Sequence, residues 1–293
     1  MTPVKVGFVG QLAGYWPFWV AQKQGYFTAN GLQLSMTYID TDSNLTAAAL
    51  SGSVNVIGEV PLVLYLANKN GGDMRMFCGM QNQPLYSFIA GKGITSLADL
   101  KGKTIAVSDV TSGSDAFVAR AALAAAGLGP SDYTLASTGA ESSRVAAVKS
   151  GAVAATVVNA PFNTEAIADG LTDLGQTTSL VPHLQWTGLA ATASWLSSNA
   201  GTAKKLCSSL VQGEKFLLNP ANQVTAVADL QAGTGLAADS VKAQYTGVNS
   251  GLVSTFSTNG SMDSAGFGTW AKLLDVSPGN LTALQDNSFL PSP

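Results

Sequence analysis

Short apolar runs alternate with helical stretches through about the first 190 residues of the chain. Runs that are mostly apolar and end at glycine, proline or polar residues predict buried strands. We predict strands at residues 4–9, 33–38, 54–58, 74–80, 86–90, 104–107, 133–135 and 154–158. Stretches between them that begin at proline or a capping residue and end near glycine predict helices at 17–24, 44–50, 61–70, 115–126, 141–149 and 161–169. This alternation predicts an α/β fold with parallel-rich sheets that are flanked by crossover helices.

The pattern changes from residue 194 onward. Helical periodicity dominates there, with helices predicted at 204–218, 222–231, 240–245 and 264–274. We expect this helical C-terminal region to pack around a lobe that the earlier strands have already built.

The chain also repeats itself at a constant offset of 99 residues. The matches are Gly14 with Gly113, Phe18 with Phe117, Ala47-Ala48 with Ala146-Ala147, Ser51-Gly52 with Ser150-Gly151, Val54 with Val153 and Gly71 with Gly170. Any two strand–helix–strand units share glycines at their turns, so the identities alone leave that simpler explanation open. Because element order and spacing agree as well, we favour two lobes built on one plan.

Composition narrows the class of partner. The 293 residues include 46% hydrophobic and only 11% charged side chains, with a net charge of −3. No basic face is indicated, so we expect neither nucleic acid nor an anionic membrane surface as a partner. No run of 18 or more apolar residues is present. The start, Met1-Thr-Pro-Val-Lys, lacks the pattern of a secretory signal, which leaves open a cytoplasmic protein or one whose signal lies outside this sequence.

The two cysteines, Cys78 and Cys207, are both flanked by apolar residues. One disulfide is possible, but the sequence shows no disulfide framework and no metal-binding pattern. We expect two buried thiols rather than a bridge, since free cysteine is among the most buried residue types.

The loop at residues 10–16 follows the first predicted strand and precedes a helix. This position, at the carboxyl end of a strand and the amino end of a helix, is where open α/β folds bind small ligands. Gly14 would let the backbone approach a ligand, and Tyr15 and Trp16 could cover it. The alternative is that these aromatic side chains pack the core of a tight loop, and for Trp19, inside the helix, that alternative is favoured.

Several segments resemble one family of binding proteins. They are Pro17 with Val20-Ala21, Gly25-Tyr26-Phe27 with Gly31-Leu32, the segment 47–52 with Val54, ITSLADLKGKTIAV at 94–107, AAVKSGAVAA at 146–155, and Asn159-Ala160-Pro161. Together they resemble the periplasmic substrate-binding proteins of ABC transporters in the nitrate/sulfonate/taurine, SsuA/THI5-like (NMT1-like) family. The resemblance covers about residues 4–200. Asn55, Ala154 and Asn159 depart from acidic positions common in the family.

The resemblance implies a two-lobed periplasmic-binding-protein clamp of type II, with the ligand cleft between the lobes. Lobe one would be discontinuous, residues 1–88 plus 190–293, and lobe two would be residues 89–189. The implied function is capture of a small organic solute outside the cytoplasm, in the periplasm, by a monomer. Hinge closure would then present the solute to the membrane subunits of an ABC importer.

In lobe two, Thr111-Ser112-Gly113-Ser114-Asp115 opens a predicted helix. Hydroxyls and free N–H groups at a helix start suit an anion, so Ser112, Gly113 and Ser114 are candidates to bind a sulfonate or carboxylate. Ordinary helix capping by Ser112 or Ser114 is an equal alternative.

Further candidates lie at strand ends. Asn159, Gln81 (with Asn82 and Gln83) and Trp186 could contact a ligand. Glu59 would repel an anion unless it paired with Arg144, so it points instead to a cationic or NH-bearing ligand, or to a solvated or capping side chain. Arg144 could pair with an anionic group of the ligand, but it is more typical of a solvated or i,i+3-paired residue. Arg75 and Arg120 are weaker candidates to bind a ligand anion. A sulfonate or carboxylate is our first expectation, a neutral heterocycle the second and nitrate the third.

The sequence favours binding over catalysis. His183 is the only histidine, and neither a G-x-S-x-G elbow, a GxGxxG or P-loop after a strand, nor a metal-ligand cluster occurs. We expect no cofactor and no metal. Relatives on this fold include a desulfinase with a cleft cysteine and pyrimidine synthases that consume a histidine, and Cys78 and His183 match neither pattern well. An enzyme on this fold, or a ligand-sensing module, are the alternatives.

Overall fold

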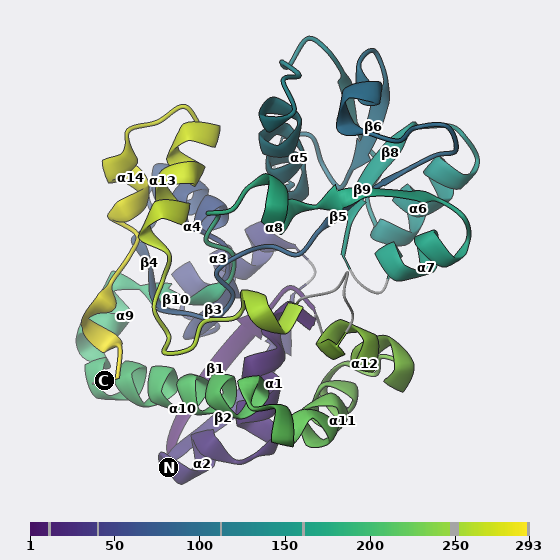
Figure 1. The fold of residues 1–293 in the computed structure, drawn as a ribbon. Coiled ribbons are helices and arrows are strands. Elements are labelled where there is room, and N and C mark those ends of the chain that lie inside the picture. The colour runs from purple at the N-terminus through teal and green to yellow at the C-terminus, as the bar shows by residue number, and fades with distance from the viewer. Residues whose placement is uncertain (11–12, 40, 112, 160–161, 247–251, 292–293) are drawn as a thin grey trace. The chain divides into compact units, whose positions relative to one another are not determined.

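The computed structural model describes residues 1–293 except 11–12, 40, 112, 160–161, 247–251 and 292–293. The side chains of residues 240, 243, 244, 246, 252 and 254 are also outside the description. The chain divides into two compact units (Figure 1). Unit 1 comprises Met1–Gln83 and His183–Pro293, and unit 2 comprises Pro84–Pro182. Each boundary lies several residues before the one that the sequence suggested.

Unit 1 is built on a five-stranded sheet in the order β2-β1-β3-β10-β4. Its strands are β1 (Thr2–Phe8), β2 (Leu32–Tyr38), β3 (Val56–Glu59), β4 (Met74–Gly79) and β10 (Gly188–Thr192). β1 pairs in parallel with β2 and β3, whereas β10 is antiparallel to both β3 and β4. The sheet is therefore mixed, because β10, which follows unit 2 in the chain, is inserted antiparallel between β3 and β4.

Ten helices surround this sheet in the described part of unit 1. They are α1 (Trp16–Lys23), α2 (Tyr26–Ala29), α3 (Asp42–Leu50), α4 (Pro61–Lys69), α9 (Ala193–Ser198), α10 (Ala200–Leu218), α11 (Gln223–Thr234), α12 (Ala238–Thr246), α13 (Ser264–Leu273) and α14 (Pro278–Thr282). α10 packs against α1 so closely that a Cβ on Gly213 would lie 2.3 Å from the Pro17 carbonyl oxygen. The helical C-terminal region thus wraps the first sheet, as expected.

A disulfide joins Cys78 of β4 to Cys207 of α10, with an S–S distance of 2.02 Å. This corrects the expectation of two free buried thiols. The residues are separated by 129 positions in sequence, so only the packing of α10 beside β4 reveals the pair. Gly260 lies against the bridge, because a Cβ there would be 2.9 Å from the Cys78 sulfur and 3.0 Å from the Cys207 sulfur.

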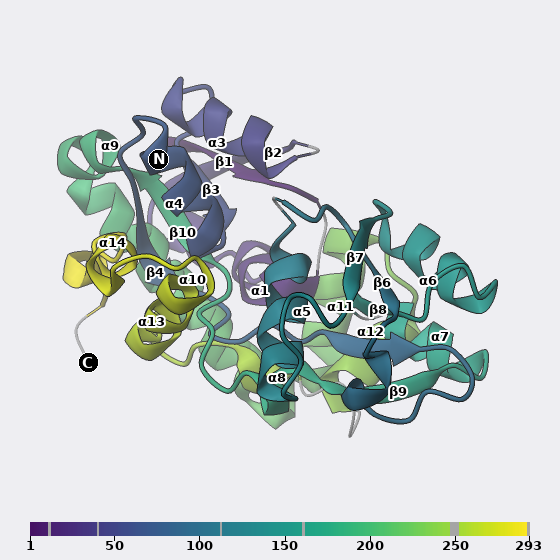
Figure 2. The same cartoon turned by 90° about the horizontal axis from the view of Figure 1, so that it is seen from above.

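Unit 2 contains a second five-stranded sheet in the order β7-β6-β8-β5-β9 (Figure 2). Its strands are β5 (Ser87–Ala90), β6 (Thr104–Val107), β7 (Thr134–Ser137), β8 (Ala155–Val158) and β9 (Thr172–Gln176), and its helices are α5 (Ser114–Ala125), α6 (Glu141–Lys149), α7 (Phe162–Ala168) and α8 (Thr177–Leu180). β6 is parallel to β7 and β8, and β5 is antiparallel to β8 and β9. β9 and β10 are the two strands that the sequence pattern missed.

Short 3-10 helices complete the secondary structure of both units. They lie at Ala13–Tyr15, Leu97–Leu100, Pro220–Asn222, Leu252–Thr255 and Asn287–Phe289. No helix in the described residues is long and apolar enough to cross a membrane.

The internal repeat extends to the register of the two sheets. Val6 pairs with Val56 in unit 1, and Ile105 pairs with Ala155 in unit 2, so both partners are shifted by the same 99 residues. The helix Asp42–Leu50 is shifted by the same offset onto Glu141–Lys149. In each sheet the fourth strand in order is antiparallel to its neighbours. This agreement confirms that the two units share one plan.

Candidate functional site

The loop after β1 contacts the end of β3 in unit 1. The Tyr15 hydroxyl donates to the Gly58 carbonyl at 3.3 Å, and its ring lies 4.6 Å from that of Phe8. A Cβ on Gly14 would lie 3.0 Å from the Gln81 side-chain oxygen. The structure therefore brings Gly14, Tyr15 and Gln81 together at the carboxyl edge of the sheet. Tyr15 is almost fully buried there.

Trp16 and Trp19 point into the interior of unit 1. Trp16 is 0% exposed, and its ring N–H donates to the Ala226 carbonyl at 2.8 Å. Its ring also meets Tyr245 edge-on at 5.8 Å. Trp19 is equally buried and packs against Gly233. These contacts are the core packing that the sequence left open as the alternative for both tryptophans.

Glu59 ends β3 with its carboxyl group enclosed by protein. The residue is 3% exposed, and one carboxyl oxygen, Oε2, accepts a hydrogen bond from the Val60 N–H at 2.9 Å. The other oxygen, Oε1, is also buried, and the Asp42 side chain is a further hydrogen-bond partner of the Glu59 carboxyl. Burial first, and the nearby Asp42 carboxyl second, raise the pKa of Glu59 well above its ordinary value. Glu59 is thus neither solvated nor paired with a cation.

Gln81 joins the segments that follow β4 and precede β10. Its backbone N–H donates to the Thr187 carbonyl at 2.9 Å, and its side-chain amide donates to the Thr255 hydroxyl at 3.0 Å. Trp186 stacks on Trp270 with ring centroids 6.1 Å apart. The side-chain oxygens Asn82 Oδ1 and Thr187 Oγ1 are buried without a partner in the described structure. Unsatisfied oxygens thus gather where these strands end.

A cavity of about 310 Å³ lies beside these residues, within unit 1. Its walls are formed by Asn82, Gln83, His183, Thr255, Phe256 and Asp263. His183 Nδ1 lies 3.1 Å from a carboxylate oxygen of Asp263. Sequence analysis named Asn82 and Gln83 here but missed Phe256 and Asp263, because nothing in the sequence shows that the late segments return to the end of β4.

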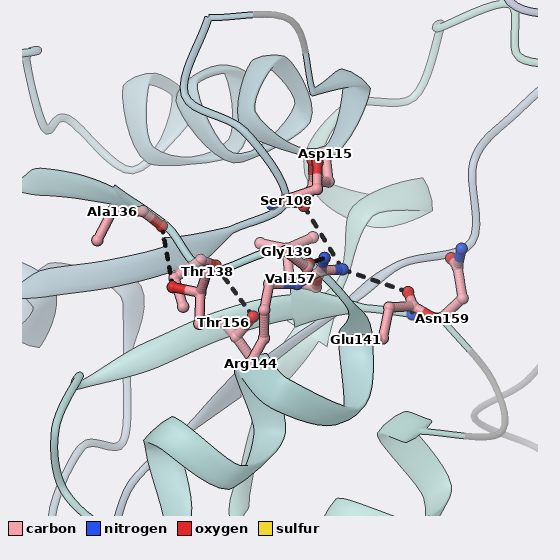
Figure 3. Close-up of polar contacts among 11 residues, drawn as sticks. Ser108, Asp115, Ala136, Thr138, Gly139, Glu141, Arg144, Thr156, Val157 and Asn159 are labelled. Atoms are coloured by element: carbon pink, nitrogen blue, oxygen red, sulfur yellow. Dashed lines mark hydrogen bonds and ion pairs between the residues drawn. The ribbon is translucent and has the colours of Figure 1, made fainter. Parts of the chain in front are cut away.

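Unit 2 carries a buried ionic cluster at the corresponding strand ends (Figure 3). Arg144, from α6, lies 3.5 Å from Asp115 Oδ2 at the start of α5, and both side chains are 4% exposed. Its guanidinium also donates to the Gly139 carbonyl at 2.5 Å and the Val157 carbonyl at 3.2 Å. Arg144 is therefore not solvated, which was one of the two alternatives given for it. Its i,i+3 pairing with Glu141, at 3.5 Å, was confirmed.

The start of α5 is occupied by Asp115. The Ser108 hydroxyl and backbone N–H donate to its carboxylate at 2.5 and 2.8 Å. Gly113 is the N-cap residue and α5 has no side-chain cap, so capping by Ser114 was not found. A Cβ on Gly113 would lie 2.3 Å from the Ser108 hydroxyl, which is why glycine is required there. Ser112 lies outside the described residues.

Glu141 and Asn159 are linked in unit 2. Glu141 Oε1 accepts a hydrogen bond from the Asn159 backbone N–H at 2.9 Å. Burial is the main reason that the pKa of Glu141 rises to about 7, although this hydrogen bond and Arg144 oppose the shift. Burial also raises the pKa of Tyr86, whose hydroxyl interacts with the Asn159 side chain. Asn159 therefore stands at the edge of a polar network.

No group of three or more metal-ligating side chains occurs within the described ranges. The candidate site in each unit is thus a set of polar side chains and backbone groups at strand ends. In unit 1 the strand-end carboxyl Glu59 has a raised pKa, and in unit 2 Arg144 is already held by Asp115 and Glu141.

Solved structures with a similar fold cover most or nearly all of this chain. The aliphatic sulphonate-binding protein SsuA from Escherichia coli has a TM-score of 0.71 at 19% identity, covering 84% of this chain and 82% of that one. The alkanesulfonate-binding protein SsuA from Xanthomonas axonopodis pv. citri, bound to MOPS, has a TM-score of 0.76 at 15% identity, covering 98% and 99%. A cysteine-to-serine mutant of DszB, in complex with biphenyl-2-sulfinic acid, has a TM-score of 0.66 at 13% identity, covering 98% and 97%.

These likenesses establish the fold as that of the type II periplasmic binding proteins. A search of curated protein sequences finds no match. The family model described as NMT1/THI5 like matches residues 13–223, well over half of the chain. The chain belongs to the NMT1/THI5-like family.

Proposed function

We propose that the protein is the extracytoplasmic solute-binding component of an ABC importer and captures a small organic molecule without altering it. The family match over residues 13–223 carries this proposal. Two units of one plan, each with polar groups at the carboxyl ends of its strands, are the arrangement that a closing clamp requires.

In this proposal both units supply residues to the ligand site, and hinge closure follows binding of the solute. Unit 1 would contribute Gly14, Tyr15, Glu59, Gln81 and Trp186. Unit 2 would contribute Ser112, Gly113, Ser114 and Asn159. In this proposal Trp16 supports the loop without touching the ligand, because its ring is fully buried within unit 1. Arg144 supports the strand ends of unit 2 rather than meeting the ligand, since its guanidinium is held by Asp115, Gly139 and Val157.

The Cys78–Cys207 disulfide supports the extracytoplasmic location. Disulfides form and persist in oxidising compartments such as the periplasm, and they are rare in the cytosol. Both cysteines of the chain take part in this one bridge. The periplasm or cell exterior is therefore the proposed site of action.

A sulfonate or carboxylate head group is the first ligand class to test, because the SsuA relatives are named as sulfonate-binding proteins. The start of α5 already holds the Asp115 carboxylate. A ligand anion would therefore lie toward Ser114 and Asn159 rather than at the helix axis, where Asp115 would repel it.

Because the fold is also similar to that of DszB, catalytic activity should be tested together with binding. In the disulfide form neither cysteine is available as a thiolate nucleophile. His183 paired with Asp263 beside the unit 1 cavity is the remaining candidate acid–base group. An enzyme would lose its activity in a His183→Ala variant, whereas a binding protein would keep its ligand affinity.

The decisive experiment is a thermal-shift screen of the purified protein against aliphatic and aromatic sulfonates, carboxylates, nitrate and pyrimidines. A ligand present at 100 times its Kd stabilises the protein by about 2.7 kcal/mol. Mass spectrometry then shows whether the bound compound is recovered unchanged, as a carrier requires. Recovery of a chemically altered compound would show that the protein is an enzyme rather than a carrier.

A further inference from the structure

Glu141 connects the buried Arg144 of unit 2 to the end of strand β8 (Figure 3). Its Oε1 lies 3.5 Å from the Arg144 guanidinium and accepts a hydrogen bond from the Asn159 backbone N–H at 2.9 Å. Asn159 directly follows β8, and the proposed function assigns it to the ligand. A carboxyl at the start of α6 therefore holds the backbone of a candidate ligand-binding residue.

The titratable groups that face Glu141 come from several elements. Arg144 belongs to α6 itself, Asp115 lies at the start of α5, and both act on the charge of Glu141. Tyr86, which precedes β5, interacts with the same three charges. The elements β6, β8 and α7 also pack against α6. The two strands, TIAV and ATVV, contain no titratable side chain, and Glu165 of α7 is exposed.

The proton on Glu141 decides the net charge of this cluster. With Glu141 ionised, its carboxylate and that of Asp115 outweigh Arg144 by one negative charge. With Glu141 protonated, Asp115 and Arg144 balance each other and the cluster is neutral. Burial raises the pKa of Tyr86, so its hydroxyl adds no charge. Burial also raises the pKa of Glu141 to about 7, so both forms of the cluster are populated at neutral pH.

The equivalent strand-end N–H in unit 1 is also held by a carboxyl. Val60 lies 99 residues before Asn159, and its N–H donates to Glu59 Oε2 at 2.9 Å. Glu59 is buried, whereas the Glu141 side chain is 22% exposed. A carboxyl at this place is therefore part of the shared plan, and the one in unit 2 can exchange its proton with solvent.

A neutral cluster suits an anionic solute better than a negative one. An anion at Asn159 would be close to the Glu141 carboxyl, because that carboxyl is hydrogen-bonded to the backbone of the same residue. Charges that are largely shielded from water interact more strongly than exposed ones. A protonated carboxyl still has an oxygen that can accept the Asn159 N–H. Protonation of Glu141 thus removes the repulsion and keeps the contact.

We propose that Glu141 is a positioning residue for Asn159, and that an anionic solute binds at Asn159 together with one proton, which Glu141 takes up from solvent. This inference rests on the proposed solute-binding function and adds a dependence on pH. By linkage, the anion favours the protonated form of Glu141, and the proton favours binding of the anion. The affinity for the anion is then highest at low pH and falls as the pH rises.

The test measures the affinity of probes whose own charge is the same at both pH values. Ethanesulfonate and benzenesulfonate stay ionised, and benzenesulfonamide is the uncharged counterpart of the second. Isothermal calorimetry at pH 5.5 and pH 9 gives the Kd of each probe. For the wild-type protein we expect a sulfonate Kd about 10-fold higher at pH 9, the size of a typical coupling between two sites. The Kd of benzenesulfonamide should not change.

Three variants assign the effect to one carboxyl. Glu141→Gln keeps an oxygen for the Asn159 N–H but cannot ionise, so its sulfonate Kd should equal the wild-type value at pH 5.5 under both conditions. Glu141→Ala also lacks the acceptor and should bind sulfonate more weakly at both pH values. Glu165→Gln removes an exposed carboxyl of α7 and should keep the wild-type pH dependence.

A measurement without ligand tests the positioning contact by itself. The amide resonance of Asn159 in heteronuclear NMR spectra should titrate with a midpoint near pH 7 in the wild-type protein, because its N–H donates to Glu141. The same resonance should not titrate in Glu141→Gln. If that variant does not fold, the wild-type titration and the wild-type pH dependence of the Kd decide, and absence of either overturns the proposal.

The outcomes separate this inference from the proposed function. Sulfonate binding that is independent of pH, or a pH dependence that survives Glu141→Gln, overturns the inference and leaves a solute-binding protein. A sulfonate that binds with the expected pH dependence but is recovered chemically altered supports the inference and overturns the carrier function. Failure of both sulfonates to bind at 10 mM overturns the inference, and the wider thermal-shift screen then decides whether another solute is captured.

Discussion

Units 1 and 2 share a sheet order and a strand register but handle buried charge in opposite ways. Two positions related by the 99-residue offset show the difference. Trp16 and Leu45 in unit 1 correspond to Asp115 and Arg144 in unit 2. The first pair is fully buried and apolar, and the second forms an ion pair. One backbone plan thus supports either an aromatic core or an ionic cluster at the same place.

The elements that cover each unit explain the choice. In unit 1, α10 and α11 pack against α1, so the first helix is enclosed and Trp16 reaches the backbone of α11 at Ala226. Unit 2 has only α5, α6, α7 and α8 among its described residues. Its small interior is held by hydrogen-bonded charges instead. The two units therefore share their backbone geometry, and the elements packed against each unit determine whether an equivalent position is apolar or charged.

The largest effect should follow from giving unit 2 the residue of unit 1. Arg144→Leu leaves Asp115 buried without its cation, so the free energy of unfolding should fall by about 3–5 kcal/mol. Chemical denaturation monitored by circular dichroism measures the loss. Adding Asp115→Asn to Arg144→Leu should recover part of it, since the unpaired charge is then gone. A loss below about 1 kcal/mol would show that the Arg144–Asp115 pair contributes little to the stability of unit 2.

Removing the disulfide tests the covering of unit 1. Cys78→Ala with Cys207→Ala should lower the free energy of unfolding by about 2–5 kcal/mol, because the bridge closes a long loop in the unfolded chain. Reduction of the wild-type protein with dithiothreitol provides an independent comparison. The same reductant should leave the stability of the double variant unchanged, and a further loss there would mean that the reductant acts elsewhere.

Glu141 should make the stability of unit 2 depend on pH. Its pKa rises from an ordinary value of 4.5 to about 7 on folding, so the folded protein binds more protons than the unfolded chain between these values. The associated stability is complete below about pH 4.5 and is lost as the pH rises through about 7. We expect Glu141→Gln to flatten this fall, on the order of 1–3 kcal/mol. Denaturation series at pH 5 and pH 8 measure it, and parallel curves for both proteins would contradict the shift.

The smallest effect concerns Tyr15 in unit 1. Tyr15→Phe removes the hydrogen bond to the Gly58 carbonyl but keeps the ring against Phe8. The free energy of unfolding should fall by about 1 kcal/mol. Thermal denaturation measures the change, with Tyr133→Phe in unit 2 as a matched control. A loss of more than about 3 kcal/mol would mean that the hydroxyl does more than satisfy one carbonyl.

The hydrophobic pattern located most elements of the first 170 residues within one or two positions. Thr104–Val107 was placed without error, and Glu141–Lys149 likewise. The missed strand Gly188–Thr192 has the sequence GLAAT. Apart from Leu189 its residues are small, and only Thr192 is β-branched, so the segment carries little local strand signal. It forms a strand because it is inserted between two others.

The candidate site was harder to predict than the fold. The sequence identified the strand ends and named Glu59 as an unexpected charge, but it could not show that Arg144 is enclosed by Asp115 and two carbonyls. It also could not decide between ligand contact and core packing for Trp16. Both answers depend on contacts between residues far apart in sequence.

The disulfide has a consequence for the covalent connectivity of the molecule. Cys78 precedes unit 2 in the chain and Cys207 follows it, so the bridge and residues 78–207 form a closed ring that contains all of Pro84–Pro182. A protease that cuts once anywhere in unit 2 opens this ring but releases no fragment. The nicked protein remains one covalent molecule, and it separates into two pieces on a gel only after reduction.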